Sequence, residues 1–172
     1  MKAGRLAVAV GAALLVGLAG TAFAVNDTAD QTVTITVEEI AQLSASGSPG
    51  TLILSQAGTT PGSLPVAATE ATTSLSWTSN VTAGHTRKVT AGLDATFTAG
   101  IVLKATLAKP AGSNGASAGQ KTLSATAADM LTGVTNENCT SATISFEATL
   151  SAIIAPVTDE TKTLTWTLTA EE

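Results

Sequence analysis

Threonine alternates strictly with apolar residues in a segment near the start of the chain. Its six residues are Thr32, Val33, Thr34, Ile35, Thr36 and Val37. Successive side chains of a β-strand point to opposite faces, so the three apolar side chains would share one face and the threonines the other. A helix would scatter them around its axis. Because β-branched residues also suit a pleated surface, the pattern predicts a half-buried strand.

The same period of two recurs near the end of the chain and at several places between. Leu164, Trp166 and Leu168 share one predicted face within residues 162–169, and threonines occupy the other face. Further short runs of this kind cover residues 40–46, 52–55, 73–79, 87–93, 101–107, 121–125 and 143–150. Only residues 127–131 favour a turn of helix. The chain is therefore expected to be all-β, as a single antiparallel β-sandwich of roughly eight or nine strands.

The first 24 residues have the organisation of an export signal. Lys2 and Arg5 precede an uncharged apolar stretch over residues 6–18, and Ala22-Phe23-Ala24 follows. This order is typical of a secretory signal peptide that is cleaved after the small-residue site. A retained membrane anchor is the alternative, since a spanning helix needs about 20 apolar residues. We expect a signal peptide (1–24), a flexible leader (25–31) and a β-sandwich domain (32–172) in a protein that is secreted or held at the cell surface.

The mature chain would be acidic. Without the signal it has 148 residues, with six Lys or Arg against 13 Asp or Glu. This balance disfavours binding to nucleic acid phosphates and to anionic membrane surfaces. The single cysteine, Cys139, has no partner for an internal disulfide. It is expected either as a small buried residue or as a cross-link between two chains.

Residues suited to catalysis are scarce. His85 is the one histidine and is predicted to lie in a turn, and no serine has the spacing of a nucleophile elbow. The acidic pairs 38–39, 159–160 and 171–172 are sequence neighbours, which point apart on a strand. Glycosidases instead need two carboxylates that converge across about 5–9.5 Å. We predict that the protein is not an enzyme and has no catalytic residues.

Metal ligands are few as well. One histidine and one cysteine are too few for a zinc site. Calcium needs only oxygen ligands, and residues 136–138 (Asn-Glu-Asn) and 159–160 (Asp-Glu) are oxygen-rich, although neither has EF-hand spacing. We expect no cofactor, and calcium at these turns is the one alternative.

Four large aromatic residues remain after the signal, and they distinguish two classes of function. They are Trp77, Phe97, Phe146 and Trp166. We expect them to help fill the core. A module that binds a glycan would instead present aromatic side chains on its surface. Buried tryptophans would favour a scaffold, and tryptophans exposed in a groove would favour a ligand site.

Residues 32–37 suggest a mode of assembly. An uncharged, alternating strand near a chain end can add to the open sheet edge of another subunit. The segment follows a short polar leader, which suits an exchangeable strand. The alternative is that it pairs within its own sandwich. The expected partners are therefore further copies of this chain or a cell-wall component.

Residues 164–169, Leu-Thr-Trp-Thr-Leu-Thr, resemble the closing Trp-x-Leu motif of the WxL family of bacterial cell-surface proteins, through Trp166 and Leu168. The resemblance implies a β-rich exported domain attached noncovalently to peptidoglycan. The earlier motif of that family is altered here, because Ser79 stands where leucine is expected after Trp77. The whole chain is also similar to small exported bacterial β-sandwich proteins of unassigned role. Fibre-forming matrix proteins resembling the TasA and camelysin type share that outline, although the chain has none of their diagnostic motifs. We expect a non-catalytic structural protein of the cell surface or extracellular matrix, with a small glycan-binding module as the alternative.

Overall fold

The computed structural model describes residues 29–171, which contain nine strands and no helix. The chain divides into two units, one ending at Thr36 and one beginning at Val37. All nine strands belong to the second unit and form two antiparallel sheets. The expected all-β fold is confirmed, and the arrangement is that of a β-sandwich.

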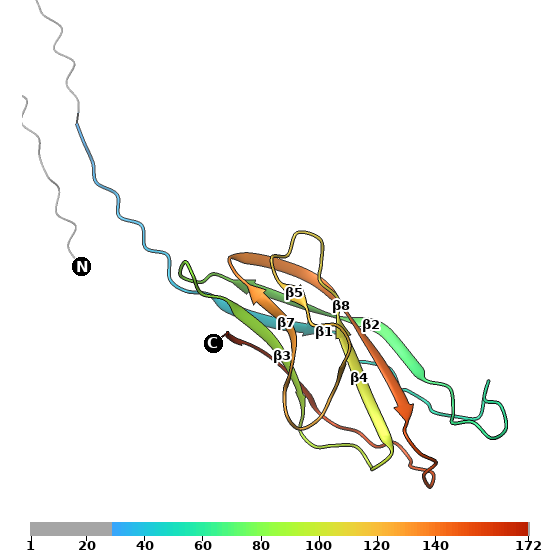
Figure 1. Ribbon diagram of the computed structural model, residues 1–172. Coiled ribbons are helices and arrows are strands. Elements are labelled where there is room, and N and C mark those ends of the chain that lie inside the picture. Colours follow the sequence, from blue (N-terminus) through green and yellow to red (C-terminus); the bar gives the residue numbers. More distant parts are fainter. Residues whose placement is uncertain (1–28, 172) are drawn as a thin grey trace, which may run out of the picture. The chain divides into compact units, whose positions relative to one another are not determined.

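The larger sheet has five strands in the order β1-β2-β8-β4-β6. Figure 1 shows β8 beside β2 and β4. The strands are β1 (Ala41–Ser46), β2 (Ala68–Ser79), β4 (Ile101–Leu107), β6 (Lys121–Thr122) and β8 (Glu137–Leu150). β8 is central and pairs antiparallel with both β2 and β4. Within residues 29–171, β1 pairs with β2 alone, so its other edge has no hydrogen-bonded strand there.

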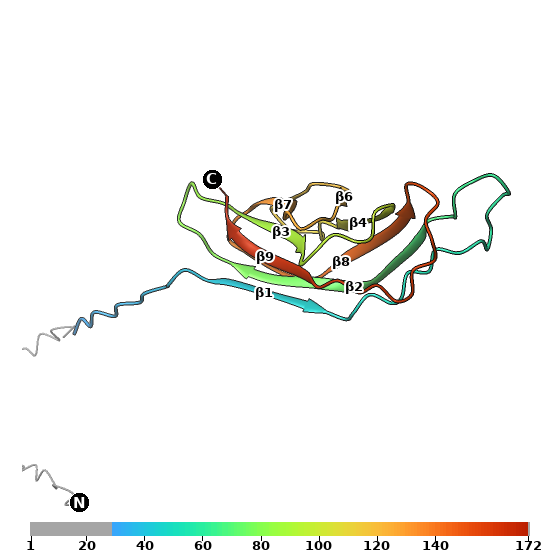
Figure 2. The ribbon, with the colours of Figure 1, turned by 90° about the horizontal axis from the view of Figure 1, so that it is seen from below.

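The smaller sheet has four strands in the order β5-β7-β3-β9. The strands are β3 (Arg87–Leu93), β5 (Ala116–Ser117), β7 (Ala128–Val134) and β9 (Leu164–Ala170). In Figure 2, β3 and β7 lie above the layer that contains β1 and β2. β9 pairs with β3 on one side and has a free edge on the other.

The core lies between the inner faces of the two sheets. Its largest fully buried side chains are Leu75, Val89, Leu107, Met130, Leu131, Val134 and Ile144. Trp77 and Phe146 are also buried, at 2% and 4% exposure. Each large apolar side chain buried in this way contributes about 1.5–3 kcal/mol relative to an exposed position. The predicted core role of these two aromatics is confirmed.

A bulge changes the alternation of β8. The pairing steps from Leu75–Ala142 to Trp77–Cys139, so β8 carries one extra residue there. The bulge lies at Ser141, whose backbone has a positive φ of 56°. Both Cys139 and Ala142 therefore face the core although they are three residues apart. The strand expected at 143–150 consequently begins earlier, at Glu137.

Irregular pairing also explains an error in our sequence interpretation. Residues 127–131 form no helical turn: Ala127 precedes β7, and residues 128–131 are its start. The pairing of β3 with β7 shifts register on both sides of Val89. Met130 and Leu131 are consequently both fully buried although they are neighbours, which breaks the period of two.

Two other predicted strands are absent from the described residues. Residues 52–55 belong to a loop in which Ile53 is 70% exposed. Residues 32–37 form no strand and belong to neither sheet; the first paired residue is Ala41. The first strand of the sandwich is therefore β1. The predicted signal peptide (1–24) and residues 25–28 of the leader lie outside the described residues.

Candidate assembly site

Residues 32–37, which we call the N-terminal segment, carry exposed apolar side chains at alternate positions. Val33, Ile35 and Val37 are 78%, 82% and 76% exposed. The segment also carries no charge. Exposed β-branched residues with the period of a strand form a surface suited to pairing with a sheet edge. The half-buried strand that the sequence predicts is therefore not formed by the described chain.

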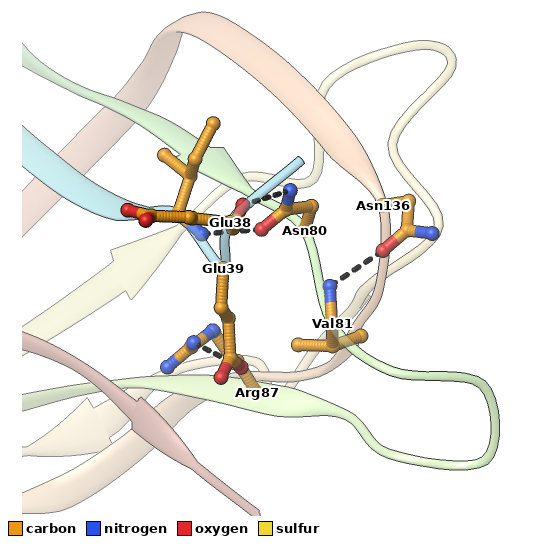
Figure 3. Close-up of polar contacts among 7 residues, drawn as sticks. Glu38, Glu39, Asn80, Val81, Arg87 and Asn136 are labelled. Carbon is orange, nitrogen blue, oxygen red and sulfur yellow. Dashed lines mark hydrogen bonds and ion pairs between the residues drawn. The ribbon is translucent and has the colours of Figure 1, made fainter. Parts of the chain in front are cut away.

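A polar cluster holds the backbone that follows the segment (Figure 3). Asn80 donates a hydrogen bond from Nδ2 to the carbonyl oxygen of Glu38 at 2.9 Å, and its Oδ1 accepts one from the backbone N–H of Ile40. The backbone N–H of Asn80 in turn donates to the carbonyl oxygen of Ile40 at 3.0 Å. The side chain of Asn80 thus provides hydrogen-bond partners for the carbonyl of Glu38 and the N–H of Ile40, just before β1 begins. The partner strand β2 has already ended at Ser79, so no strand backbone supplies these bonds.

An ion pair reinforces the same place. Arg87 Nη2 lies 2.6 Å from Glu39 Oε1, and the two side chains are 13% and 61% exposed. Asn136 Oδ1 accepts a hydrogen bond from the backbone N–H of Val81 at 2.6 Å, which secures the end of β2 (Figure 3). Because the Glu39 carboxylate is largely exposed, water screens this pair, and such pairs are usually worth less than about 1 kcal/mol. We call Glu38, Glu39, Ile40, Asn80 and Arg87 the clamp, because they fix where β1 starts.

His85 lies near the clamp, in the connection between β2 and β3. It is exposed, and with Glu39, Thr86 and Glu171 it lines a shallow hollow. Glu171 Oε2 accepts hydrogen bonds from Thr86 Oγ1 at 2.9 Å and from the backbone N–H of Gly133 at 2.8 Å. Glu39 is paired with Arg87. No hydrogen bond among residues 29–171 joins the His85 ring to either carboxylate.

The free edge of β9 leaves part of the core only half covered. Its inward residues Leu164, Trp166 and Leu168 pair with Leu93, Ala91 and Val89 of β3. The three β3 residues are at most 5% exposed, whereas the three β9 residues are only partly buried. Burial on this inner face thus decreases from β3 to β9. Within residues 29–171 no strand hydrogen-bonds to the other edge of β9, and β1 of the larger sheet lies close to β9.

The oxygen-rich turn at 136–138 is occupied by internal hydrogen bonds. Glu137 accepts from Trp77 Nε1 at 2.7 Å, from Ser113 Oγ at 2.9 Å and from the backbone N–H of Asn114 at 2.5 Å. The carboxylate therefore holds the loop before β5 against the first residue of β8. It also provides the acceptor that the buried indole of Trp77 needs.

The turn at 159–160 serves a similar structural purpose. Glu160 accepts hydrogen bonds from the backbone N–H of Thr98 and pairs with Lys162 at 3.1 Å. The Thr98 N–H, followed by Lys162, lowers the pKa of the Glu160 carboxyl below its ordinary value. Within residues 29–171 no three His, Cys, Asp or Glu side chains gather as metal ligands would.

Cys139 is buried, at 6% exposure, among the core residues. Burial, and to a lesser extent the charge of Glu137, raises the pKa of its thiol. A thiol of this kind is a poor nucleophile. Of the two expectations for Cys139, the geometry favours the small buried residue over the link between chains.

Comparison with known proteins finds no family model, curated protein or solved structure that matches this chain. The site therefore stands on its geometry. The sequence indicated the N-terminal segment and Trp166, but it gave no sign of the clamp, whose polar contacts join residues about forty positions apart. The described residues also contain no helix with the length and apolar character that a membrane crossing needs.

Proposed function

We propose that this protein is a non-catalytic, exported structural component of the cell surface or extracellular matrix, and that its copies associate through sheet edges. The observation that carries the proposal is the N-terminal segment, with three β-branched apolar side chains exposed at alternate positions. Strand addition would supply backbone partners and cover those side chains. The export signal supports a location outside the cytoplasm.

The clamp supports the proposal because it fixes the residues that follow the segment. Asn80 and Arg87 hold residues 38–40 at the start of β1. A segment that emerges from a fixed point loses less freedom on binding than one attached to a mobile linker. Burial of a valine or isoleucine contributes about 1.5–3 kcal/mol, so three such residues are a substantial part of a contact between subunits.

The test is a pair of charged variants examined by sedimentation velocity. Val33→Asp/Ile35→Asp places two carboxylates on the apolar face of the N-terminal segment. Thr32→Asp/Thr34→Asp adds the same charge to the opposite face and is the matched control. We expect wild-type protein and the control to form oligomers, and the first variant to sediment as a monomer. Equal oligomerisation of the two variants would refute association through this apolar face.

Retention on the cell wall remains a second element of the proposal. The resemblance of Trp166 and Leu168 to the closing WxL motif supports noncovalent attachment to peptidoglycan. Cosedimentation of the mature protein with purified peptidoglycan would test it, with loss of the protein from the supernatant as the expected result. A glycan-binding module is the rival function. It is less well supported because Trp77, one of two tryptophans, is 2% exposed and belongs to the core.

A further inference from the structure

We infer that the free edge of β9 is the acceptor for the N-terminal segment of a second copy. This inference rests on the proposed function and names the surface that receives the strand. The occupant is residues 32–37 of another molecule, added beside Leu164–Ala170 as a fifth strand of the smaller sheet. Four features of β9 lead to this assignment.

The first feature is length. The two sheets end in four edge strands, β1, β6, β5 and β9. β5 and β6 have two residues each, which is too short to template a six-residue strand. β1 has six residues and β9 has seven. Only these two edges can pair with the whole N-terminal segment.

The second feature is the incompletely covered core at β9. Its inward side chains are Leu164, Trp166 and Leu168, all only partly buried. The inward side chains of β1 are Ala41, Leu43 and Ala45, opposite the buried residues of β2. An added strand would place Val33, Ile35 and Val37 on the same face as its neighbour's inward residues. At β9 they would cover two leucines and a tryptophan, whereas at β1 they would meet mainly alanine.

The third feature is the direction of the free backbone groups. The N–H of Glu171 bonds to the carbonyl of Thr86, and the N–H of Asp94 bonds to the carbonyl of Thr163. Hydrogen-bonded pairs alternate along an antiparallel ladder, so Thr165, Thr167 and Thr169 bond to β3. The backbone groups of the inward-facing residues therefore point to the free edge. They form an uncharged row of donors and acceptors, which is the kind of edge that accepts another strand.

The outer face of the pair is complementary too. Addition of the segment would set Thr32, Thr34 and Thr36 beside Thr165, Thr167 and Thr169. Cross-strand threonine pairs are favourable, and neither strand brings a charge that would repel the other. The outward residues of β1 are Gln42, Ser44 and Ser46, so β1 offers a hydroxyl at only two of three positions and lacks the threonine methyl groups.

The test is disulfide cross-linking between two differently tagged proteins in a Cys139→Ala background. One protein carries Thr34→Cys. The other carries Thr165→Cys, Thr167→Cys or Thr169→Cys on the outer face of β9, and the matched control carries Ser44→Cys on the outer face of β1. We expect the mixed, oxidised samples to give a covalent dimer carrying both tags with at least one β9 position, and none with Ser44→Cys.

The outcomes separate this inference from the proposed function. Oligomers in sedimentation with a mixed dimer only through Ser44→Cys would overturn the β9 assignment and leave strand-mediated assembly intact. A disulfide confined to one chain, in a protein carrying both Thr34→Cys and Thr167→Cys, would also overturn it by showing that the segment pairs with its own β9. Monomers at every concentration, with no cross-link, would overturn both proposals.

Discussion

Glu137 offers the sharpest test of how the end of the sandwich is held together. Its carboxylate accepts hydrogen bonds from Trp77, Ser113 and Asn114. Replacement by alanine in Glu137→Ala removes the acceptor for all three donors. The indole N–H of Trp77 suffers most, because that side chain is only 2% exposed and water has little access to it.

The size of the effect follows from the environment of each donor. A buried donor left without a partner costs about 1–3 kcal/mol. The groups of Ser113 and Asn114 lie in a loop where water can replace the carboxylate, so each adds less than about 1 kcal/mol. We expect Glu137→Ala to lower the free energy of unfolding by about 2–3 kcal/mol, which is a large part of the 5–15 kcal/mol typical of a domain. Glu137→Gln keeps an acceptor for the indole and should lose less than half as much.

Urea unfolding followed by tryptophan fluorescence measures this loss. With a slope of about 1–3 kcal/mol per molar, the midpoint should fall by roughly 0.7–3 M. Glu38→Ala is the control, because only the main-chain carbonyl of Glu38 accepts a hydrogen bond from the clamp. A Glu137→Ala midpoint that equals that of Glu38→Ala would refute the argument, since surface substitutions usually stay within about 0.5 kcal/mol.

Two further predictions concern pH and the clamp. The pKa of Glu160 is lowered in the folded state, chiefly by the backbone N–H of Thr98, so its contribution to stability is present above the unfolded pKa and is lost as the pH falls through the folded pKa. Glu160→Gln should therefore lower the urea midpoint more at pH 7 than at pH 3, and an equal effect at both would contradict this. Asn80→Ala should speed amide hydrogen exchange at Ile40 while lowering global stability by less than about 1.5 kcal/mol, with the exposed Asn138→Ala as control. Unchanged exchange at Ile40 would show that the clamp does not hold β1.

Regular strands could be predicted from the sequence because their side chains alternate without interruption. The strands at residues 87–93 and 101–107 were predicted with the bounds of β3 and β4. Each places apolar residues on a face that packs against the opposite sheet, so a period of two appears in the sequence. The two-layer antiparallel fold follows from many such segments separated by turns.

The prediction failed where tertiary pairing breaks that period. Register shifts beside Val89 bury both Met130 and Leu131, and their adjacency imitated a helical turn. The bulge at Ser141 interrupts the alternation in the same way, so the part of β8 before residue 143 was not predicted as a strand. Where a bulge forms depends on how a strand pairs with its neighbour, and this pairing cannot be inferred from the sequence of one strand alone.

The candidate site was predicted in part. The apolar period of the N-terminal segment was visible, but its lack of a partner within the described sheets could only come from the structure. The clamp was not predictable, because Asn80 and Arg87 reach Glu38, Ile40 and Glu39 through contacts between distant positions. Side-chain hydrogen bonds to backbone leave no periodic signal in a sequence.

The most direct measurement of the central claim is the molar mass of the mature protein in solution. Sedimentation velocity would compare residues 25–172 with residues 37–172, a form that keeps the clamp and all nine strands. The account predicts oligomers that grow with concentration for the longer form and monomers for the shorter. A longer form that stays monomeric at every concentration, or a shorter form that assembles equally well, would contradict it.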